Sequence, residues 1–417
     1  MKRALPFILL SVCLALLLGA CGAQPVRSPA FAEEPAASDA AEPTATPSPA
    51  PTPEPEPIRC TVVACGDVVP HWELLQEAFS KDTDEYDFAP MLSGVEPFLS
   101  EADYAFCTTE CAFVEKGFSA YPSFRTPAAL LKGLQEVGFD MICLASNHCC
   151  DAKLEGVFSS IDACEALGLD HTGTYRTQEE RETDRGILFR DINGIEFAFI
   201  DYTSITNQHE LYDNAWAVRT LFRDYFFLEP KQLLYDEIDE DIEYARACGA
   251  DIVIVICHWG YEYATVPAAY QTELAERMIE DGADIIIGSH PHVLQPATVY
   301  SYQDCGVERN AYVFYSLGNF FTGMTNELGN ISPCVRMQFE KDPESGLVTV
   351  SAVDYSLLYR AALSRRPDDG GPLYRLLDAD TPADALPEWL SPSLGSAMQT
   401  VRQKALSVLG EELYIHS

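Results

Sequence analysis

The chain has 417 residues, 47% of them hydrophobic, and its 64 acidic and 27 basic side chains give a formal net charge of -37 at pH 7. A chain of this length and composition can bury one large core or two smaller ones, which excludes a protein that is disordered throughout. The negative charge argues against nucleic acid as a partner. It also repels a polyanionic substrate unless divalent cations or local basic residues intervene.

The first 21 residues have the pattern of an export signal. Lys2 and Arg3 precede an apolar run from Ala4 to Leu18, which is too short for a confident membrane span. The sequence Leu18-Gly19-Ala20-Cys21 resembles the bacterial lipobox, so residues 1–21 are expected to be a lipoprotein signal with Cys21 as the lipidated residue. The alternative is an ordinary signal peptide with a chance cysteine. A lipid anchor on Cys21 would place the protein on the extracytoplasmic face of a bacterial cell membrane.

Three further segments follow the signal. Residues 22–57 are rich in Ala, Pro, Glu, Thr and Ser, a composition that buries little apolar area and favours an extended, semi-rigid tether. Residues 58–360 carry the strong secondary-structure signals and form the predicted folded domain. Residues 361–417 are expected to be a C-terminal extension that ends in a helix near Leu394–Leu409.

The first half of the folded domain alternates strands and helices. Apolar, β-branched runs predict strands at 59–65, 104–107 and 141–144, and periodic patterns predict helices near 90–100, 128–137 and 154–167. Two strands at 186–190 and 196–202 flank Asn193-Gly194, a dipeptide typical of a tight hairpin. This rhythm predicts an α/β fold with polar residues at successive strand ends, where such folds build their sites.

The second half continues the pattern. Helices are predicted at 230–248 and 268–281, and strands at 252–257, 284–287, 312–315, 335–339 and 348–355, the last two as a hairpin that closes one sheet. The chain has 14 cysteines, several of them inside the predicted buried strands, where a free thiol behaves as a small apolar side chain. We therefore expect mostly free thiols rather than disulfides.

Histidines follow the apolar strands repeatedly. His148, His258, His290 and His292 come directly after predicted strands, and His71 lies four residues past Asp67. Together with Asp67, Glu110 and Asn147 they supply the carboxylate, amide and imidazole ligands that borderline divalent metals accept. Two ions about 3.5 to 4 Å apart would activate water and polarise a phosphoryl or carbonyl group. The alternative is that these polar side chains only satisfy backbone groups in loops.

The same residues stand in motifs that resemble the CapA/PgsA family of capsule (poly-γ-glutamate) synthesis proteins. The resemblance runs from about Thr61 to Phe321. Its motifs, in chain order, are Gly66-Asp67, Thr109-Glu110, Phe124-Arg125-x-Pro127, Asn147-His148-x-x-Asp151, His258-Trp259-Gly260-x-Glu262-Tyr263, residues 282–296 and Tyr315-Ser316-Leu317-Gly318-Asn319-Phe320. That family is similar to the calcineurin-like metallophosphatases. The resemblance therefore implies two β-sheets flanked by helices in a four-layer αββα arrangement, with a dinuclear metal site between the sheets.

The resemblance also implies a role for each site residue. Asp67 and His292 would bind a first ion, Glu110 would bridge, and Asn147, His258 and His290 would bind a second, the ions being Mn, Fe or Zn. His148 would protonate a leaving group. Arg125 would hold an anionic substrate group or serve as a structural ion-pair partner. Trp259, Glu262 and Asn319 would support the ligands, face the substrate or be packing and turn residues. Val69 stands where the superfamily has a histidine, and His71, two residues further on, is the remaining candidate ligand.

Three functions remain open from the sequence. The first is a membrane-tethered, metal-dependent hydrolase or transferase that acts on a phosphoester or on the amide of a γ-glutamyl polymer, alongside other membrane proteins of capsule synthesis. The second is a non-catalytic scaffold whose bound cations hold an anionic polymer. The third is a metallophosphoesterase with no link to capsule.

Overall fold

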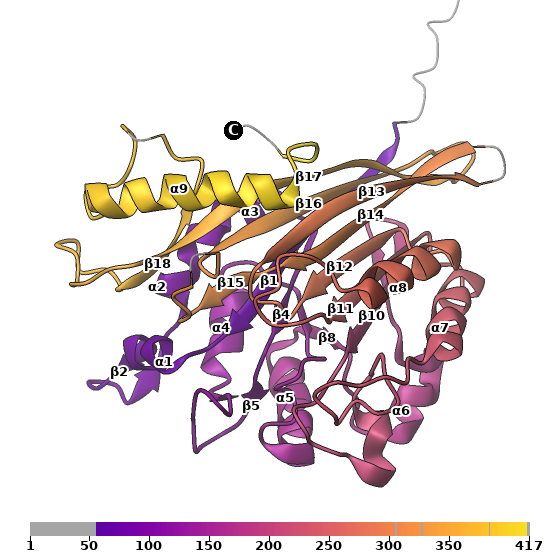
Figure 1. Ribbon diagram of the computed structural model, residues 1–417, viewed down its shortest axis with the longest axis horizontal. Helices are drawn as coiled ribbons and strands as arrows, with labels where there is room; N and C mark the ends of the chain where they lie inside the picture. Colours follow the sequence, from indigo (N-terminus) through magenta and orange to yellow (C-terminus); the bar gives the residue numbers. More distant parts are fainter. Residues whose placement is uncertain (1–55, 305–306, 327, 383, 415–417) are drawn as a thin grey trace, which may run out of the picture. The chain divides into compact units, whose positions relative to one another are not determined.

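Two large β-sheets organise the computed structural model, which describes residues 56–304, 307–326, 328–382 and 384–414 (Figure 1). These residues fall within one compact unit, 54–417. The predicted signal, Cys21 and nearly all of the predicted tether lie outside the described residues. In the described part of the chain, no helix combines the length and the apolar character needed to cross a membrane.

The first sheet has eight strands. Its order is β18 (Tyr374–Asp378), β17 (Val348–Ala362), β16 (Ile331–Lys341), β1 (Ile58–Val69), β4 (Tyr104–Thr109), β7 (Met141–Cys143) and β8 (Asp170–Thr172), and β15 (Asn319–Thr322) also pairs with β1. Strands β1, β4, β7 and β8 are mutually parallel, whereas β16 is antiparallel to β1. The carboxyl ends of β1, β4 and β7 therefore meet at one edge.

The second sheet has six strands. Its order is β13 (Leu294–Asp304), β14 (Val307–Leu317), β12 (Ile285–Ser289), β11 (Ile252–His258), β10 (Ile195–Thr203) and β9 (Leu188–Ile192). Strands β10, β11, β12 and β14 are parallel. The hairpin predicted at Asn193-Gly194 is confirmed, because β9 and β10 pair antiparallel and both turn residues have positive φ.

Alternating side chains show that the sheets pack face to face. In β1, Val62 and Ala64 belong to the same core cluster as Ile254 and Ile256 of β11, whereas Val63 belongs to a different cluster. Because successive strand residues point to opposite sides of a sheet, the shared cluster lies between the two sheets. Each sheet then has one outer face left to cover.

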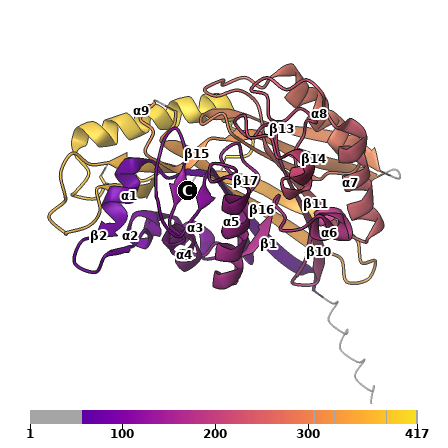
Figure 2. The same cartoon turned by 90° about the horizontal axis from the view of Figure 1, so that it is seen from below.

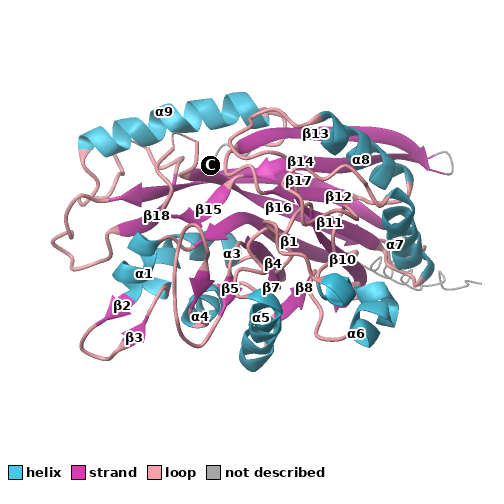
Figure 3. Cartoon of the chain, turned by 60° about the horizontal axis from the view of Figure 1, so that its bottom comes forward, coloured by secondary structure: helices cyan, strands magenta, loops and turns pink. Residues whose placement is uncertain are grey.

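Helices cover these outer faces (Figure 3). The first sheet packs against α1 (Trp72–Ala78), α2 (Ala89–Leu92), α3 (Glu96–Leu99), α4 (Ala129–Glu136) and α5 (Lys153–Leu167) through apolar residues such as Leu130 and Ile161. The second packs against α7 (Tyr235–Ala247) and α8 (Ala269–Glu280) through residues such as Ile242 and Leu274. The result is helix, sheet, sheet, helix, which confirms the predicted fold class.

The structure differs from the sequence prediction in several elements. The helix expected near 90–100 is α2, a 3₁₀ turn (Ser93–Val95) and α3, with Pro90 and Pro97 in the first turns of α2 and α3. The helix expected from Pro230 begins only at Tyr235. Strands β8, β13, β15 and β18 were not predicted.

The residues expected to form a C-terminal extension belong to the same unit as the predicted domain. Strand β18 extends the first sheet beyond the hairpin of β16 and β17, so that hairpin does not close it. Helix α9 (Pro392–Leu409) packs Met398 and Leu406 into the cluster between the sheets. Figures 1 and 2 agree that α9 lies apart from α7 and α8.

The cysteines are free thiols, as expected, in the part of the chain that the structure describes. Eleven are described, and all but Cys248 are buried. The adjacent Cys149 and Cys150 have sulfur atoms 3.7 Å apart, too far for a disulfide bond. Cys13, Cys21 and Cys305 lie outside the described residues.

Candidate metal centre

The predicted ligands gather where the carboxyl ends of parallel strands from both sheets meet. The first sheet contributes Asp67 near the end of β1, Glu110 directly after β4, and Asn147 and His148 after β7. The second contributes His258, the last residue of β11, and His290 and His292 just past β12. All seven residues are buried.

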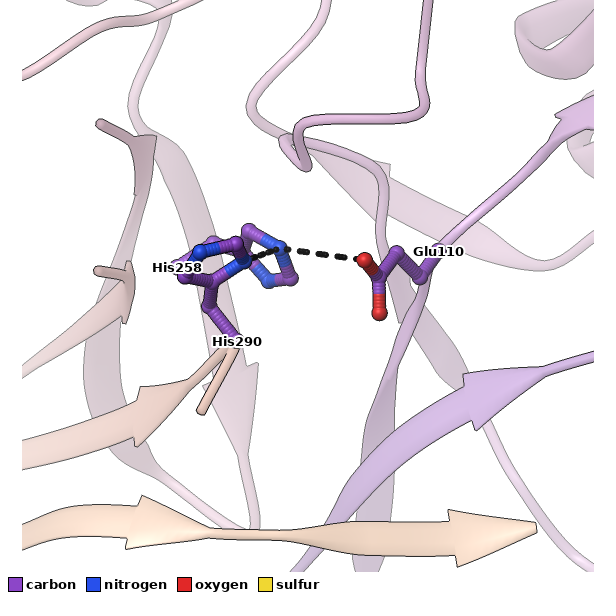
Figure 4. Close-up of side chains that lie close together, drawn as sticks. All are labelled: Glu110, His258 and His290. Atoms are coloured by element: carbon purple, nitrogen blue, oxygen red, sulfur yellow. Dashed lines mark hydrogen bonds and ion pairs between the residues drawn. The ribbon is translucent and has the colours of Figure 1, made fainter. Parts of the chain in front are cut away.

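The ligand atoms form two groups that share Glu110. Glu110, His258 and His290 make one group and Asp67, Glu110 and His292 the other, and within each group all ligand atoms lie within 4.8 Å of one another. Glu110 Oε1 is 3.8 Å from His258 Nε2, and Glu110 Oε2 is 3.5 Å from His292 Nε2. In Figure 4 the Glu110 carboxylate faces His258 and His290 across the gap between their strands. This division matches the ligand sets that the resemblance implies.

Three of the four carboxylate oxygens in this centre have no hydrogen-bond partner among the described residues. Asp67 Oδ1 and both oxygens of Glu110 are buried and accept no hydrogen bond from a described residue. Burial raises the pKa of Asp67 to about 7, and burial together with the nearby Asp67 charge raises the pKa of Glu110 well above its usual range. A buried carboxylate without a partner is costly, so the donor set fits a bound cation.

Burial shifts the pKa of the imidazoles in the opposite direction, downward. Burial lowers the pKa of His258 well below its usual range, that of His290 to about 3 and that of His292 to about 4. These side chains are therefore neutral at physiological pH, and a neutral imidazole is the form that binds a metal. Neutral imidazoles facing unpaired carboxylates are the ligand combination that borderline divalent cations accept.

Polar neighbours contact three of the candidate ligands, His258, His292 and Asp67. Ser289 Oγ lies 2.9 Å from His258 Nδ1, and Asn319 Oδ1 lies 3.0 Å from His292 Nδ1. Such contacts fix the ring orientation and the tautomer of a ligating histidine. The backbone N–H of His290 donates to Asp67 Oδ2 at 3.0 Å. Asn319, whose role the sequence left open, thus contacts a candidate ligand, His292.

The turn after β12 holds both histidines in an uncommon backbone conformation. His290 has φ +93° and His292 has φ +58°, and their ring centroids are 6.0 Å apart. Non-glycine residues adopt positive φ at a cost, and such strain gathers at functional sites. That Pro291 holds the two rings apart stays a prediction from the sequence.

Asn147 is also brought into the centre. Its Oδ1 lies 2.9 Å from His258 Nε2, on the side of His258 that faces Glu110. The amide oxygen of Asn147 is thus placed beside the group that Glu110, His258 and His290 form. Its position agrees with the ligand role that the resemblance implies.

His148 lies at the rim of the centre and is held by Asp151. His148 Nδ1 is 2.6 Å from Asp151 Oδ2, and His148 Nε2 is 3.8 Å from Glu110 Oε1. With Nδ1 on this carboxylate, Nε2 is the ring nitrogen on the side of Glu110, and Asn207 Nδ2 lies 3.2 Å from it. No role was predicted for Asp151 from the sequence, although its position three residues after His148 was a usable signal.

Three other residues lie outside the ligand groups. The ring nitrogen His71 Nδ1 is 3.2 Å from Thr322 Oγ1 and 3.1 Å from the Val69 carbonyl, so His71 joins neither group. Arg125 forms no ion pair with a described residue, and its Nε is buried without a hydrogen-bond partner. Trp259 is fully buried and donates to the Tyr315 carbonyl, so it is a packing residue.

Gly66 explains how Asp67 reaches the centre. The N–H of Asp67 donates to the Gly318 carbonyl at 2.9 Å, and a Cβ at position 66 would lie 2.2 Å from that oxygen. Only glycine permits this approach of β1 to the turn before β15. The glycine of the Gly66-Asp67 motif is therefore required for a steric reason.

Comparison with known proteins agrees with these features. The sequence profile of the family described as "Bacterial capsule synthesis protein PGA_cap" matches residues 61–324, more than half of the chain and the segment that contains every ligand described above. The chain belongs to this family.

Two curated relatives are similar to the same part of the chain. The capsule biosynthesis protein CapA of Bacillus anthracis is 29% identical over 232 residues, 54% of this chain and 52% of that protein. The PGA biosynthesis protein CapA of Bacillus subtilis is 27% identical over 244 residues, 58% of each chain. The chain thus matches only a little over half the length of these relatives.

Solved structures give weaker likenesses. The calcineurin-like phosphoesterase YfkN from Bacillus subtilis has a TM-score of 0.36 and 13% identity, covering 84% of this chain and 99% of that one. The Thermus thermophilus sulfate thiohydrolase SoxB has a TM-score of 0.35 and 12% identity, covering 85% and 62%. The fold class stands on the two packed sheets described above.

Proposed function

We propose that this member of the capsule synthesis family is a metal-dependent hydrolase or transferase with two divalent cations between its sheets. The proposal rests on Glu110. Both of its carboxylate oxygens are buried and accept no hydrogen bond from a described residue, and one faces His258 while the other faces His292. A carboxylate that bridges two ions would satisfy both oxygens at once. The ions would be Mn, Fe or Zn, since imidazole and carboxylate suit all three.

Each site residue would have its own role in the reaction. His258, His290 and Asn147 would hold one cation, Asp67 and His292 the other, with Glu110 between them. Bound cations supply Lewis acidity that polarises a phosphoryl or carbonyl oxygen. His148 Nε2 would give a proton to the leaving group, while the Asp151 carboxylate on Nδ1 holds the orientation of the ring. The substrate would be a phosphoester or the amide of a γ-glutamyl polymer.

Turnover of a generic phosphodiester tests this function. The purified full chain would be assayed with Mn²⁺ and bis(4-nitrophenyl) phosphate, next to Asp67→Ala, Glu110→Gln and His290→Ala. We expect metal-dependent turnover that each variant reduces at least about 100-fold, while a control variant, His171→Ala, keeps it. Tight metal binding without turnover of the ester or of polyglutamate would contradict an enzyme and favour a scaffold that holds an anionic polymer through its cations.

We also propose that Cys21 anchors the protein by lipid on the extracytoplasmic face of the membrane. The lipobox-like sequence before Cys21 supports this, and other membrane proteins of capsule synthesis would then be its neighbours. In cells, Cys21→Ser would release the protein from the membrane fraction. A variant that stays with the membrane would contradict the lipid anchor.

A further inference from the structure

A tight turn after β10 brings a side chain from the second sheet onto site residues of the first. The turn comprises residues 206–209, and the His209 N–H donates to the Thr206 carbonyl at 2.9 Å. Its two central residues have positive φ, +47° at Asn207 and +66° at Gln208, as in a type I′ turn. Gln208 is exposed, whereas Asn207 is partly buried. Asn207 is therefore the central turn residue that reaches into the protein.

Hydrogen bonds hold this turn against its surroundings. The Ser204 N–H donates to the His258 carbonyl at 2.8 Å, and the Thr206 N–H donates to the Tyr225 carbonyl at 3.1 Å. Thr206 is buried, and its Oγ1 donates to the His209 carbonyl at 2.7 Å. The backbone thus fixes the place from which the Asn207 side chain meets the site.

The Asn207 amide lies between two residues that the resemblance assigns to the site. Its Nδ2 is 3.2 Å from His148 Nε2 and 3.3 Å from His148 Nδ1, and its Oδ1 is 3.4 Å from Asn147 Nδ2. His148 Nδ1 faces the Asp151 carboxylate, which only accepts hydrogen bonds, so the neutral ring offers Nε2 as an acceptor. An amide NH₂ group suits that nitrogen, whereas an amide oxygen does not. Asn207 therefore turns its oxygen to Asn147.

This orientation matters because only one end of the Asn147 amide can bind a cation. An amide oxygen has lone pairs for a metal, whereas an amide NH₂ group only donates hydrogen bonds. Turning the amide over about its last side-chain bond exchanges the two ends with little change of shape. In the structure, Asn147 gives its NH₂ group to Asn207 and places Oδ1 2.9 Å from His258 Nε2. In the opposite orientation the oxygens of Asn147 and Asn207 would face each other with no hydrogen between them.

A simpler explanation of Asn207 is the turn itself. Asparagine tolerates positive φ better than most residues and is common in type I′ turns. That preference accounts for the residue type at position 207 but not for the two contacts of its amide. Glycine adopts the same backbone conformation without a side chain. Asn207→Gly therefore separates the two explanations, because it suits the turn and removes the amide.

We propose that Asn207 is a positioning residue, which fixes the amide of Asn147 so that its oxygen faces the metal centre. The Asn207 oxygen accepts the Asn147 NH₂ group, and the contact of its own NH₂ group with His148 keeps that oxygen in place. Contacts of this kind behind a ligand set the orientation in which the ligand meets its ion. The proposal deepens the proposed function and rests on it, since Asn147 is a ligand only if the centre holds a cation.

Metal affinity of the full chain tests this role without any need for turnover. Mn²⁺ would be titrated calorimetrically into the wild type, Asn207→Gly, Asn147→Ala and the double variant. We expect Asn207→Gly to weaken binding about 10-fold, the lower end of the range for a residue that orients a ligand. Because Asn207 acts through Asn147, Asn207→Gly should cause no further loss when Asn147→Ala is already present. Gln208→Gly, at the next position of the same turn, should bind as the wild type does.

A spectroscopic measurement examines the ligand itself. With Co²⁺ in place of Mn²⁺, the visible absorption depends on the ligands around the ion and on their geometry. The spectrum of Asn207→Gly should therefore approach that of Asn147→Ala, while that of Gln208→Gly stays with the wild type. A spectrum of Asn207→Gly identical to that of the wild type would contradict the positioning role.

Three results of the titrations would also overturn the proposal: undiminished affinity in Asn207→Gly, an equal loss in Gln208→Gly, or a loss from Asn207→Gly that is as large with Asn147→Ala as without it. Mn²⁺ binding that depends on Asn207 in a protein without turnover would refute the proposed function alone. Metal-dependent turnover with an affinity indifferent to Asn207→Gly would refute the positioning role alone. A wild-type chain that binds no divalent cation would overturn both.

Discussion

At the scale of single residues, the account depends on how burial tunes the ionisable groups around Glu110. Burial favours the neutral form of every one of them: it raises the pKa of Asp67 and Glu110 and lowers that of the three histidines. Neutral histidines are ready to bind a cation, whereas protonated carboxyl groups are not. The competition between metal and proton is therefore confined to the two carboxyl groups.

Metal affinity should consequently depend on pH below neutrality. Asp67, with a pKa of about 7 in the metal-free protein, holds a proton below that pH and must release it to bind a cation. His290 and His292 add no competition above pH 5, because their pKa values are about 3 and 4. We predict that Mn²⁺ affinity falls at least about fivefold from pH 7 to pH 6, measured by calorimetry in two buffers to count released protons. Constant affinity over this range would contradict the assignment.

Asp151 supplies a second prediction at this scale. Asp151→Asn should leave metal content unchanged but lower turnover of the phosphodiester about 10- to 100-fold, because the His148 ring loses the carboxylate that fixes its orientation and tautomer. As Asp151 positions His148, the pH profile of turnover should shift too. An unchanged profile would mean that Asp151 has only a structural role, through its bond to the Phe124 N–H.

At the scale of elements, the site is assembled by strand ends that approach each other closely. Gly66→Ala should push β1 away from the Gly318 carbonyl and displace Asp67. We predict metal binding weaker by about 10-fold or more with a folded chain, measured by calorimetry and circular dichroism. The control is Gly346→Ala in the turn between β16 and β17, where an added Cβ meets no atom within 4 Å and the φ of +73° strains only that turn, so metal affinity should stay that of the wild type. Equal metal affinity of both variants would contradict the steric role of Gly66.

Helix α9 carries a prediction about stability. Leu406 is 5% exposed and packs into the cluster between the sheets, so Leu406→Ala should lower the free energy of unfolding by about 2–4 kcal/mol. The exposed Gln403 of the same helix offers the control, since Gln403→Ala should change it by less than about 0.5 kcal/mol. Denaturant titration of both variants measures the difference. A Leu406→Ala variant as stable as the control would show that α9 adds nothing to the core.

Continuous apolar strands were the elements that the sequence revealed best. Residues 252–257 and 284–287 are buried on both faces, so their type and limits were readable, and with them the positions of His258 and His290. Strand β13 mixes polar and aromatic residues along an edge, and β18 is short, so neither has a clear periodic signal. Sequence spacing likewise could not show that His71 turns to Thr322, because that contact depends on tertiary packing.

At the scale of the whole molecule, all eleven described cysteines are free thiols, so the described part of the fold does not depend on disulfides. Burial raises the pKa of Cys107 and Cys143 well above the usual range, which keeps these thiols protonated and unreactive. We predict that a reducing agent changes the midpoint of thermal unfolding by less than about 2 °C. A larger loss of stability on reduction would reveal a disulfide that the account excludes for the described residues.

At the same scale, both groups of candidate ligands draw on both sheets, because Glu110 and Asp67 come from the first sheet and the three histidines from the second. Metal content of the purified full chain, measured by mass spectrometry after equilibration with Mn²⁺ at pH 7.5, tests this claim most directly. We predict about two ions per chain in the wild type and a loss of at least one in Glu110→Gln, with His171→Ala unchanged. A wild-type chain that binds no divalent metal, or a Glu110→Gln chain that binds as much as the wild type, would contradict it.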